Sequence, residues 1–187
     1  MIRATVTGLL LALLLLGCAG SKDIQITSET VQLATPGGKQ KAGRKLTFES
    51  TINRPAAMVW RQLSTPQSAL ASMKPQAILK PTKRHPMPAR WQADSTYTFK
   101  LVMNGLFPYG KHYVRYETLD SLTHTFQSRE SGRSVPVWDH YLRLTPASDS
   151  SCVLHEELVI RAGPINWYVA SYARSLFKAK HARLRQQ

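Results

Sequence analysis

Between residues 95 and 161 the chain repeatedly alternates apolar and polar side chains, and one long amphipathic segment follows. The alternation predicts antiparallel strands that bury one face, near 97–103, 110–119, 122–131, 136–146 and 151–161. The final segment, 165–185, carries an apolar stripe at helical spacing, formed by Ile165, Val169, Tyr172, Leu176 and Ala179. A meander of strands followed by one long helix indicates an α+β fold in which a curved antiparallel sheet wraps around the C-terminal helix.

The chain before residue 95 adds a strand and short helices. Residues 46–52 alternate as in a half-buried strand, and Pro55 suits the first turn of a helix over 55–64. A short helix near 66–73, a strand near 76–80 and a long proline-rich loop are expected next.

Two segments resemble a known superfamily. Residues 48–66, FESTINRPAAMVWRQLSTP, look like the first strand and helix of SRPBCC proteins, the START, polyketide-cyclase and birch-allergen-like superfamily. The ending is similar too, in Trp138-x-His140, in the alternation of Leu154, Glu156, Leu158 and Ile160, and in the helix from Phe177 to Leu184. The resemblance covers about 46–185. It implies a helix-grip fold with a pocket between sheet and C-terminal helix for lipids, sterols or polyketides.

The N-terminus predicts a bacterial lipoprotein. Residues 1–17 hold Arg3 and a short apolar run, and Leu15-Leu16-Gly17-Cys18 resembles a lipobox, so Cys18 is expected to become the lipidated first residue. An uncleaved membrane helix and a plain secretory signal are the alternatives. Residues 18–45 are expected to form a flexible tether, in which a short edge strand has room, and 46–187 the ligand-binding domain. Ala19 resembles the sorting pattern of outer-membrane lipoproteins, which places the protein on the outer membrane facing the periplasm.

The net charge favours a membrane-facing role. The sequence has 25 Lys and Arg against 11 Asp and Glu, a formal charge of +14. An envelope protein meets anionic lipid headgroups, which attract such a surface, whereas nucleic acid is not an expected partner. The alternative is a solvated basic surface that only keeps the protein soluble. The oligomeric state stays open.

A histidine and a glutamate are expected to share the concave wall. If Thr145 lies opposite Ser151 across the last turn, His140 lies opposite Glu156, on a face that is otherwise apolar. The pair is interpreted as a satisfied core pair, a polar anchor for a ligand, or an acid–base couple. A slip of one residue would bring Glu157 inward instead.

The expected ligand-binding residues are the aromatic and apolar side chains of that concave wall and of the final helix, with the polar pair among them. Their simplest alternative role is to fill the core. The apolar turn 105–109 is interpreted as a lid, a membrane-touching tip, or a turn tucked under the helix. The expected set is Tyr97, Phe99, Leu101, Phe126, Trp138, His140, Leu142, Glu156, Leu158, Tyr172 and Leu176.

The sequence gives little indication of nucleophilic catalysis, nucleotide binding or metal binding. The sequence contains no G-x-S-x-G, no phosphate loop and no G-x-G-x-x-G, and no cofactor is expected. A tight turn at Asp120-Ser121 would place Glu117 opposite His124 in a ladder on the solvent face. Metal binding is not expected, although convergence of His112, His124, His140 and Glu156 would permit it.

Three functions are therefore weighed. The first is a binding module without catalysis, and the second is a cyclase or hydrolase that uses His140 and Glu156. The third is a structural or interaction protein with no open cavity and a partner on its basic face, which a cavity well below about 300 Å³ would favour.

Overall fold

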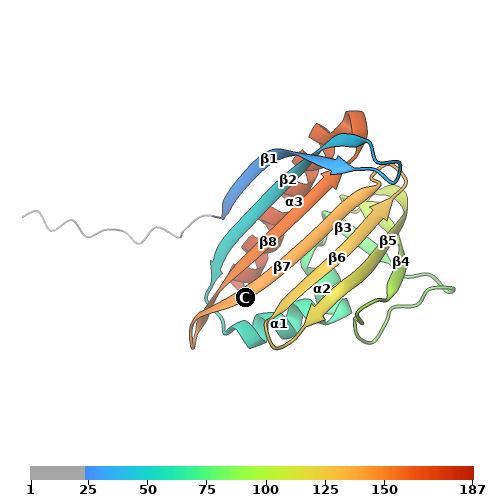
Figure 1. Ribbon diagram of the computed structural model, residues 1–187. Helices are drawn as coiled ribbons and strands as arrows, with labels where there is room; N and C mark the ends of the chain where they lie inside the picture. Colours follow the sequence, from blue (N-terminus) through green and yellow to red (C-terminus); the bar gives the residue numbers. More distant parts are fainter. Residues whose placement is uncertain (1–23) are drawn as a thin grey trace, which may run out of the picture.

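Eight antiparallel strands within residues 24–187, the part of the chain that this computed structural model describes, form one curved sheet (Figure 1). The strand order is β1-β2-β8-β7-β6-β5-β4-β3. The predicted signal peptide and Cys18 lie outside the described residues. The strands are β1 Gln25–Ala34, β2 Gln40–Ile52, β3 Ala77–Lys80, β4 Thr96–Met103, β5 Phe107–Asp120, β6 Thr125–Gly132, β7 Val137–Ser148 and β8 Ser151–Arg161.

Helices cover one face of this sheet. The long helix α3, Asn166–Gln186, lies behind the sheet in Figure 1, and the short helices α1, Ala56–Ser64, and α2, Pro66–Ser72, lie at one end. A single 3-10 turn, η1 at Gly163–Ile165, leads into α3. The α+β helix-grip architecture predicted from the sequence is confirmed.

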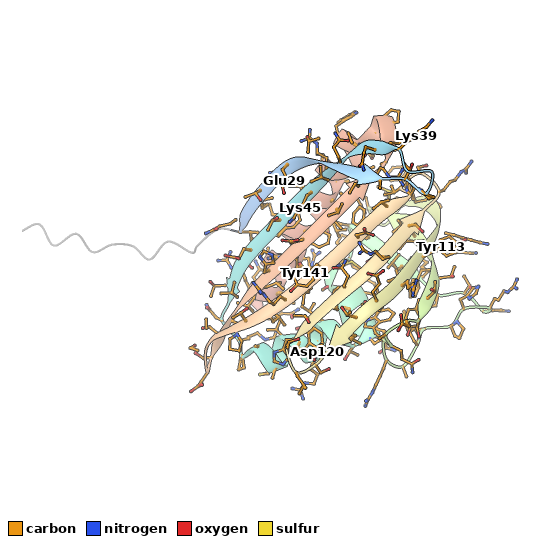
Figure 2. All side chains as sticks on the ribbon, viewed as in Figure 1. Glu29, Lys39, Lys45, Tyr113, Asp120 and Tyr141 are labelled. Atoms are coloured by element: carbon orange, nitrogen blue, oxygen red, sulfur yellow. The ribbon has the colours of Figure 1, made fainter. Side chains whose placement is uncertain are left out.

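The core lies between the concave face and α3. Alternate residues of β8 are buried, as the period of two in a strand requires. The buried residues of α3 recur every three or four positions, as the helical period requires. Phe48 of β2 stacks on Phe177 of α3 with ring centroids 4.9 Å apart. Figure 2 shows Lys45, Tyr113 and Tyr141 on the opposite, outer face of the sheet.

Residues 25–34 and 40–45 are strand rather than tether, and the edge strand for which the sequence left room does form. Residues 25–34 form β1, which pairs with β2 along its whole length, from Gln25 opposite Glu49 to Ala34 opposite Gln40. Most β1 side chains are exposed, so the ladder of backbone hydrogen bonds holds this edge strand rather than burial. The folded domain therefore begins well before residue 46.

The register of the last hairpin differs from the predicted one by two residues. Leu142 lies opposite Glu156, and His140 lies opposite Leu158. An irregularity between Pro146 and Ser148 lets Ser148 pair with Ser151, which moves the register. Because the shift is even, every side chain keeps the face that was predicted for it.

The predicted pairing of Glu117 with His124 is wrong. The turn spans four residues, so Asp120 pairs with Thr125 and Leu119 with Phe126, and Glu117 falls in a bulge. A surface ladder does form, but its centre is Arg129, which binds Glu117 at 2.9 Å and also Asp139. The reason is that the four residues 121–124 join the two strands, in place of the predicted two-residue turn at Asp120-Ser121.

Candidate functional site

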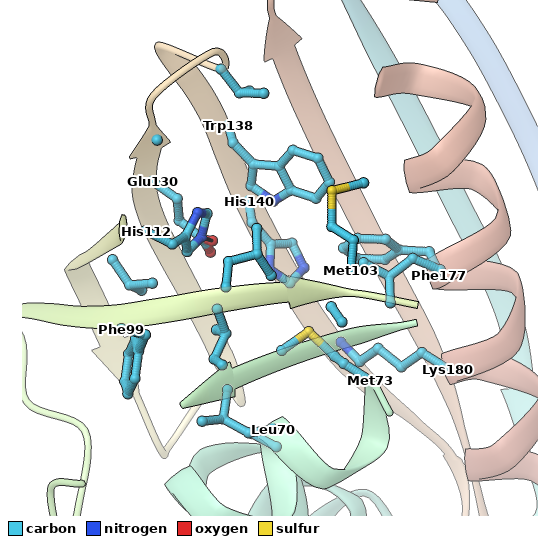
Figure 3. A pocket seen from close by; sticks show the side chains of 18 of the residues that line it. Leu70, Met73, Phe99, Met103, His112, Glu130, Trp138, His140, Phe177 and Lys180 are labelled. Atoms are coloured by element: carbon cyan, nitrogen blue, oxygen red, sulfur yellow. Dashed lines mark hydrogen bonds and ion pairs between the residues drawn. The ribbon is translucent and has the colours of Figure 1, made fainter. Parts of the chain in front are cut away.

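A cavity of about 120 Å³ lies between the concave face of the sheet, α2 and α3 (Figure 3). Its wall is mostly apolar. The volume exceeds the roughly 10–15 Å³ that one water needs, but it is below the roughly 300–1,000 Å³ of pockets that bury drug-sized ligands. A volume this far below about 300 Å³ is what we expect of a structural or interaction protein, so it counts against a carrier of a large ligand. The side chains around it include Leu70, Met73, Phe99, Val114, Tyr172 and Phe177.

Contacting rings line one side of the cavity. Trp91 lies 5.1 Å from Tyr116, Tyr116 lies 5.5 Å from Phe126, and Phe126 lies 5.0 Å from His140, between ring centroids. His140 meets Phe177 of α3 at 5.1 Å. The row extends from the proline-rich loop across the sheet to the helix and gives the cavity a rigid apolar wall.

One carboxylate organises a buried polar cluster beside this wall. Glu156 is fully buried, and its Oε1 accepts hydrogen bonds from His140 Nε2 at 2.9 Å and from Lys180 Nζ. Its Oε2 lies 2.8 Å from His181 Nε2, whose Nδ1 lies 2.8 Å from Ser50 Oγ. Burial alone would raise the pKa of Glu156, but Lys180 and the two histidines hold it well below its ordinary value. The carboxylate is therefore ionised and accepts three donors.

A second carboxylate faces the cavity from β6. Glu130 lies 2.8 Å from His112 Nε2, and its other oxygen accepts from Ser128 Oγ at 2.8 Å. Burial opposes its ionisation, yet the bonds and charge of His112 lower the pKa of Glu130. Burial and the charge of Glu130 also raise the pKa of Tyr116 well above its ordinary value, so this phenol stays protonated.

Two partly buried hydrogen bonds hold α3 in place, one from its first half and one from its end. Tyr172 donates from its hydroxyl to the backbone oxygen of Gln76, at 2.5 Å, and burial raises its pKa to about 12. Arg183 donates to the backbone oxygen of Ser72 at 2.9 Å. These two bonds tie α3 to the segment between α2 and β3.

The expected residues divide into two groups. Phe99, Leu101, Phe126, Trp138, His140, Tyr172 and Leu176 line the cavity. The other four, Tyr97, Leu142, Glu156 and Leu158, do not line it. Leu142 and Leu158 are fully buried in the packed core, and Tyr97 packs against Trp91 at 5.0 Å. Glu156 does not line the cavity itself but is hydrogen-bonded to Lys180 and His140, which do.

Sequence reasoning missed Lys180 and His181. Neither residue is among the expected site residues, whereas both are buried, at 5% and 0% exposure. The signal was present, because the apolar positions Val169, Ala173, Leu176 and Leu184 predict that position 180 faces inward. A polar residue on an apolar stripe indicates a buried partner.

The structure also shows where the other candidate histidines and the apolar turn 105–109 lie. His112 and His140 bind different carboxylates, and His124 lies against Trp60, with ring centroids 5.7 Å apart. Among the residues that the structure describes, no three or more His, Cys, Asp or Glu side chains are arranged so that they could hold a metal ion. Leu106 and Phe107 are 76% and 65% exposed, so the turn is not tucked under the helix. Within residues 24–187, no helix is long and apolar enough to span a bilayer.

Solved structures share this arrangement at low sequence identity. Protein Ms6760 from Mycobacterium smegmatis superposes with a TM-score of 0.60 at 9% identity, over 84% of this chain and 96% of that one. Truncated norcoclaurine synthase from Thalictrum flavum gives 0.56 at 13% identity, over 84% and 94%. A START superfamily protein from Mycobacterium smegmatis gives 0.53 at 13% identity, over 76% and 97%. The predicted resemblance to this superfamily is thus confirmed at the level of the fold.

Sequence comparison gives the family. No curated protein is significantly similar to the chain in sequence. A family model described as a domain of unknown function, DUF8410, matches residues 50–187, which include the cavity wall and α3. This chain belongs to the DUF8410 family.

Proposed function

We propose that this protein holds a small hydrophobic ligand in the cavity between its sheet and α3. The observation that carries the proposal is the apolar, ring-lined cavity itself, with only a few polar groups at defined positions. Binding sites for small molecules have this composition. The fold is also that of a START superfamily protein, which agrees with the proposal without deciding it.

The cavity volume limits the ligand. About 120 Å³ is close to the roughly 150 Å³ of an engineered apolar cavity that binds benzene. One ring or a short alkyl segment fits such a space, whereas a sterol, a two-chain lipid or a folded polyketide does not. We therefore narrow the ligand class that the resemblance implied to small apolar molecules.

Native mass spectrometry of the gently purified protein tests this proposal. The wild-type protein should carry a ligand mass, and Val114→Phe should lose it, because Val114 lines the cavity and the larger ring fills it. Val153→Phe is the matched control, since Val153 lies on the outer face of β8. Repeated recovery of empty wild-type protein, with no binding of small apolar probes, would favour an interaction protein instead.

We also propose that the protein is anchored to the bacterial envelope through lipid on Cys18. The lipobox-like Leu15-Leu16-Gly17-Cys18 supports this, and two acyl signals are needed for stable anchoring. Labelled palmitate should mark the wild-type protein and not Cys18→Ala. A form of the protein that begins at Ala19 should be in the soluble fraction, whereas the wild-type protein should be in the membrane fraction. A wild-type protein that takes up no labelled palmitate would contradict the anchor.

A basic recess near the cavity supports a membrane-facing orientation. Lys41, Arg133 and Arg161 line it, and none of them forms an ion pair with a residue of the described part of the chain. The loop that contributes Arg133 also contributes Val135 to the cavity wall. Anionic headgroups would complement these cations.

One observation favours catalysis as a second candidate. Because ionised Glu156 can only accept, His140 Nε2 donates the proton of this bond, and a histidine ring with its proton on Nε2 alone has Nδ1 as an acceptor. A carboxylate that orients a histidine in this way is a general-base arrangement. The expected signature is loss of turnover in His140→Ala with the native ligand still bound, whereas loss of the ligand itself would indicate an anchoring role.

A further inference from the structure

Lys180 presents unused hydrogen-bond donors at the cavity wall. Its side chain is 6% exposed and reaches the cavity from α3, with Nζ 5.3 Å from the centroid of Phe177 (Figure 3). An ammonium group has three N–H donors. Glu156 Oε1 accepts one of them, and residues 24–187 provide no second acceptor. Two donors are therefore left in a largely apolar enclosure.

The ion pair with Glu156 accounts for one donor of this lysine and not for the other two. Glu156 already accepts from His140 and His181, and Ser50 fixes the ring of His181. Replacing a buried ion pair by apolar residues of similar volume is often neutral or stabilising, so the pair is weak evidence for a stabilising role. Unpaired buried donors are costly, and an oxygen from a bound molecule would satisfy them.

We infer that the ligand carries a neutral oxygen acceptor, of the carbonyl class, which binds Lys180 Nζ while its apolar part lies along the ring row. This inference rests on the proposed function. The acceptor is neutral because Glu156 already balances the charge of Lys180. A carboxylate would add a second negative charge to a wall that also contains Glu130. Burying such a charge without a partner is strongly unfavourable.

Three probes of nearly the same shape test the inference. Acetophenone carries a carbonyl group, ethylbenzene lacks an acceptor, and benzoate carries a charge. Calorimetric titration of the wild-type protein should show acetophenone binding about tenfold or more tightly than ethylbenzene, which is the range for a hydrogen bond to a charged group. Benzoate should bind more weakly than acetophenone.

The variants keep the charge balanced. Lys180→Met combined with Glu156→Gln removes the donors without leaving a buried charge, and it should bring acetophenone and ethylbenzene to similar affinities. Lys178→Met, on the exposed side of the same helix, is the matched control and should keep the preference. The infrared carbonyl band of labelled acetophenone adds a readout on the wild-type protein alone, so the test does not depend on the folding of the double variant. The band should shift to lower frequency than in an apolar solvent.

The outcomes separate the inference from the function on which it rests. Equal affinities for acetophenone and ethylbenzene, an unshifted carbonyl band, or tighter binding of benzoate would overturn the carbonyl inference and leave the cavity as a binding site. Failure of all three probes to bind, together with empty wild-type protein in the mass spectrum, would overturn the proposed function itself.

Discussion

Glu156 and Glu157 are adjacent in sequence but lie on opposite faces of β8. Glu156 is fully buried among Lys180, His140 and His181, whereas Glu157 pairs with Lys45 at 3.0 Å and its side chain is 32% exposed. The two positions therefore compare a buried ion pair with a surface one, within one strand and with the same residue type.

We predict that Glu156→Ala destabilises the protein by about 3–5 kcal/mol, because it leaves the ammonium group of Lys180 buried and unpaired. Glu157→Ala is the control and should cost at most about 1 kcal/mol, as surface ion pairs do. Urea unfolding of both variants measures the difference. Similar losses at the two positions would contradict the assignment of Glu156 as the centre of the buried cluster.

The ionisation of Glu156 also predicts a pH dependence. Its folded pKa lies well below the ordinary value of 4.5, because Lys180 and the histidine bonds outweigh burial. Its contribution is therefore fully present above the unfolded pKa and is lost as the pH falls through the folded value. The difference in unfolding free energy between wild type and Glu156→Gln should be larger at neutral pH than at about pH 3. A difference that grows on acidification would reverse the sign and refute this account.

Residue patterns predicted faces better than partners. Alternation placed His140 and Glu156 on the buried face, and that holds because the actual register differs by an even number of residues. Alternation carries no information on which strand residues are opposite each other, since that depends on an irregularity beside Pro146. The roles of Lys180 and His181 depend on a carboxylate from another element, which no local pattern contains.

At the scale of elements, β1 shows where composition misleads. Its sequence is mostly polar, and this composition predicted a tether. Few of its side chains are buried in the structure. It is nevertheless held against β2 at a point of close approach, where a Cβ on Gly43 would lie 2.6 Å from the backbone oxygen of Ile160 and 2.7 Å from Leu33 Cδ1. The strand therefore depends on the absence of a side chain, a feature that the hydrophobic pattern does not report.

We predict that Gly43→Ala destabilises the protein by about 1–3 kcal/mol, because a backbone oxygen of the neighbouring strand must shift. Gly37→Ala is the matched control, since a Cβ there meets nothing within 4 Å. It should be neutral or slightly stabilising. Thermal unfolding compares the two, and hydrogen exchange should show faster exchange in β1 for Gly43→Ala. Equal stability of both variants would show that the strands around Gly43 can move apart without a loss of unfolding free energy.

At the scale of the whole molecule, the sequence predicted the fold but not the size of its cavity. The order of strands and the final helix were sufficient for the architecture. The volume, however, depends on distant parts that meet in space. Trp91 comes from the loop after β3, yet it is 5% exposed and packs against Tyr97, Phe99 and Tyr116 inside the fold. Only the assembled structure shows how much space such insertions leave.

The charge distribution leads to a prediction on membranes. A form of the protein that begins at Ala19 lacks both the apolar run of residues 1–17 and the proposed anchor, so any association with vesicles must come from its surface. Near an anionic bilayer each Lys or Arg contributes about 1 kcal/mol, so Lys41, Arg133 and Arg161 together contribute about 3 kcal/mol, or roughly a hundredfold in partitioning. Cosedimentation with phosphatidylglycerol vesicles should therefore be strong at about 0.1 M salt and weak at about 1 M, where the Debye length falls from about 10 to about 3 Å.

Two triple variants of the form that begins at Ala19 locate the effect. Changing Lys41, Arg133 and Arg161 to glutamine should abolish most of the cosedimentation, because these cations line one recess beside the cavity. Changing the exposed Lys83, Arg84 and Arg90 of the proline-rich loop removes the same charge and should leave most of it. If both variants lose binding equally, net charge alone attracts the protein and no face is selected. If only the first does, the recess faces the bilayer, and the cavity beside it lies close to the membrane from which an apolar ligand would enter.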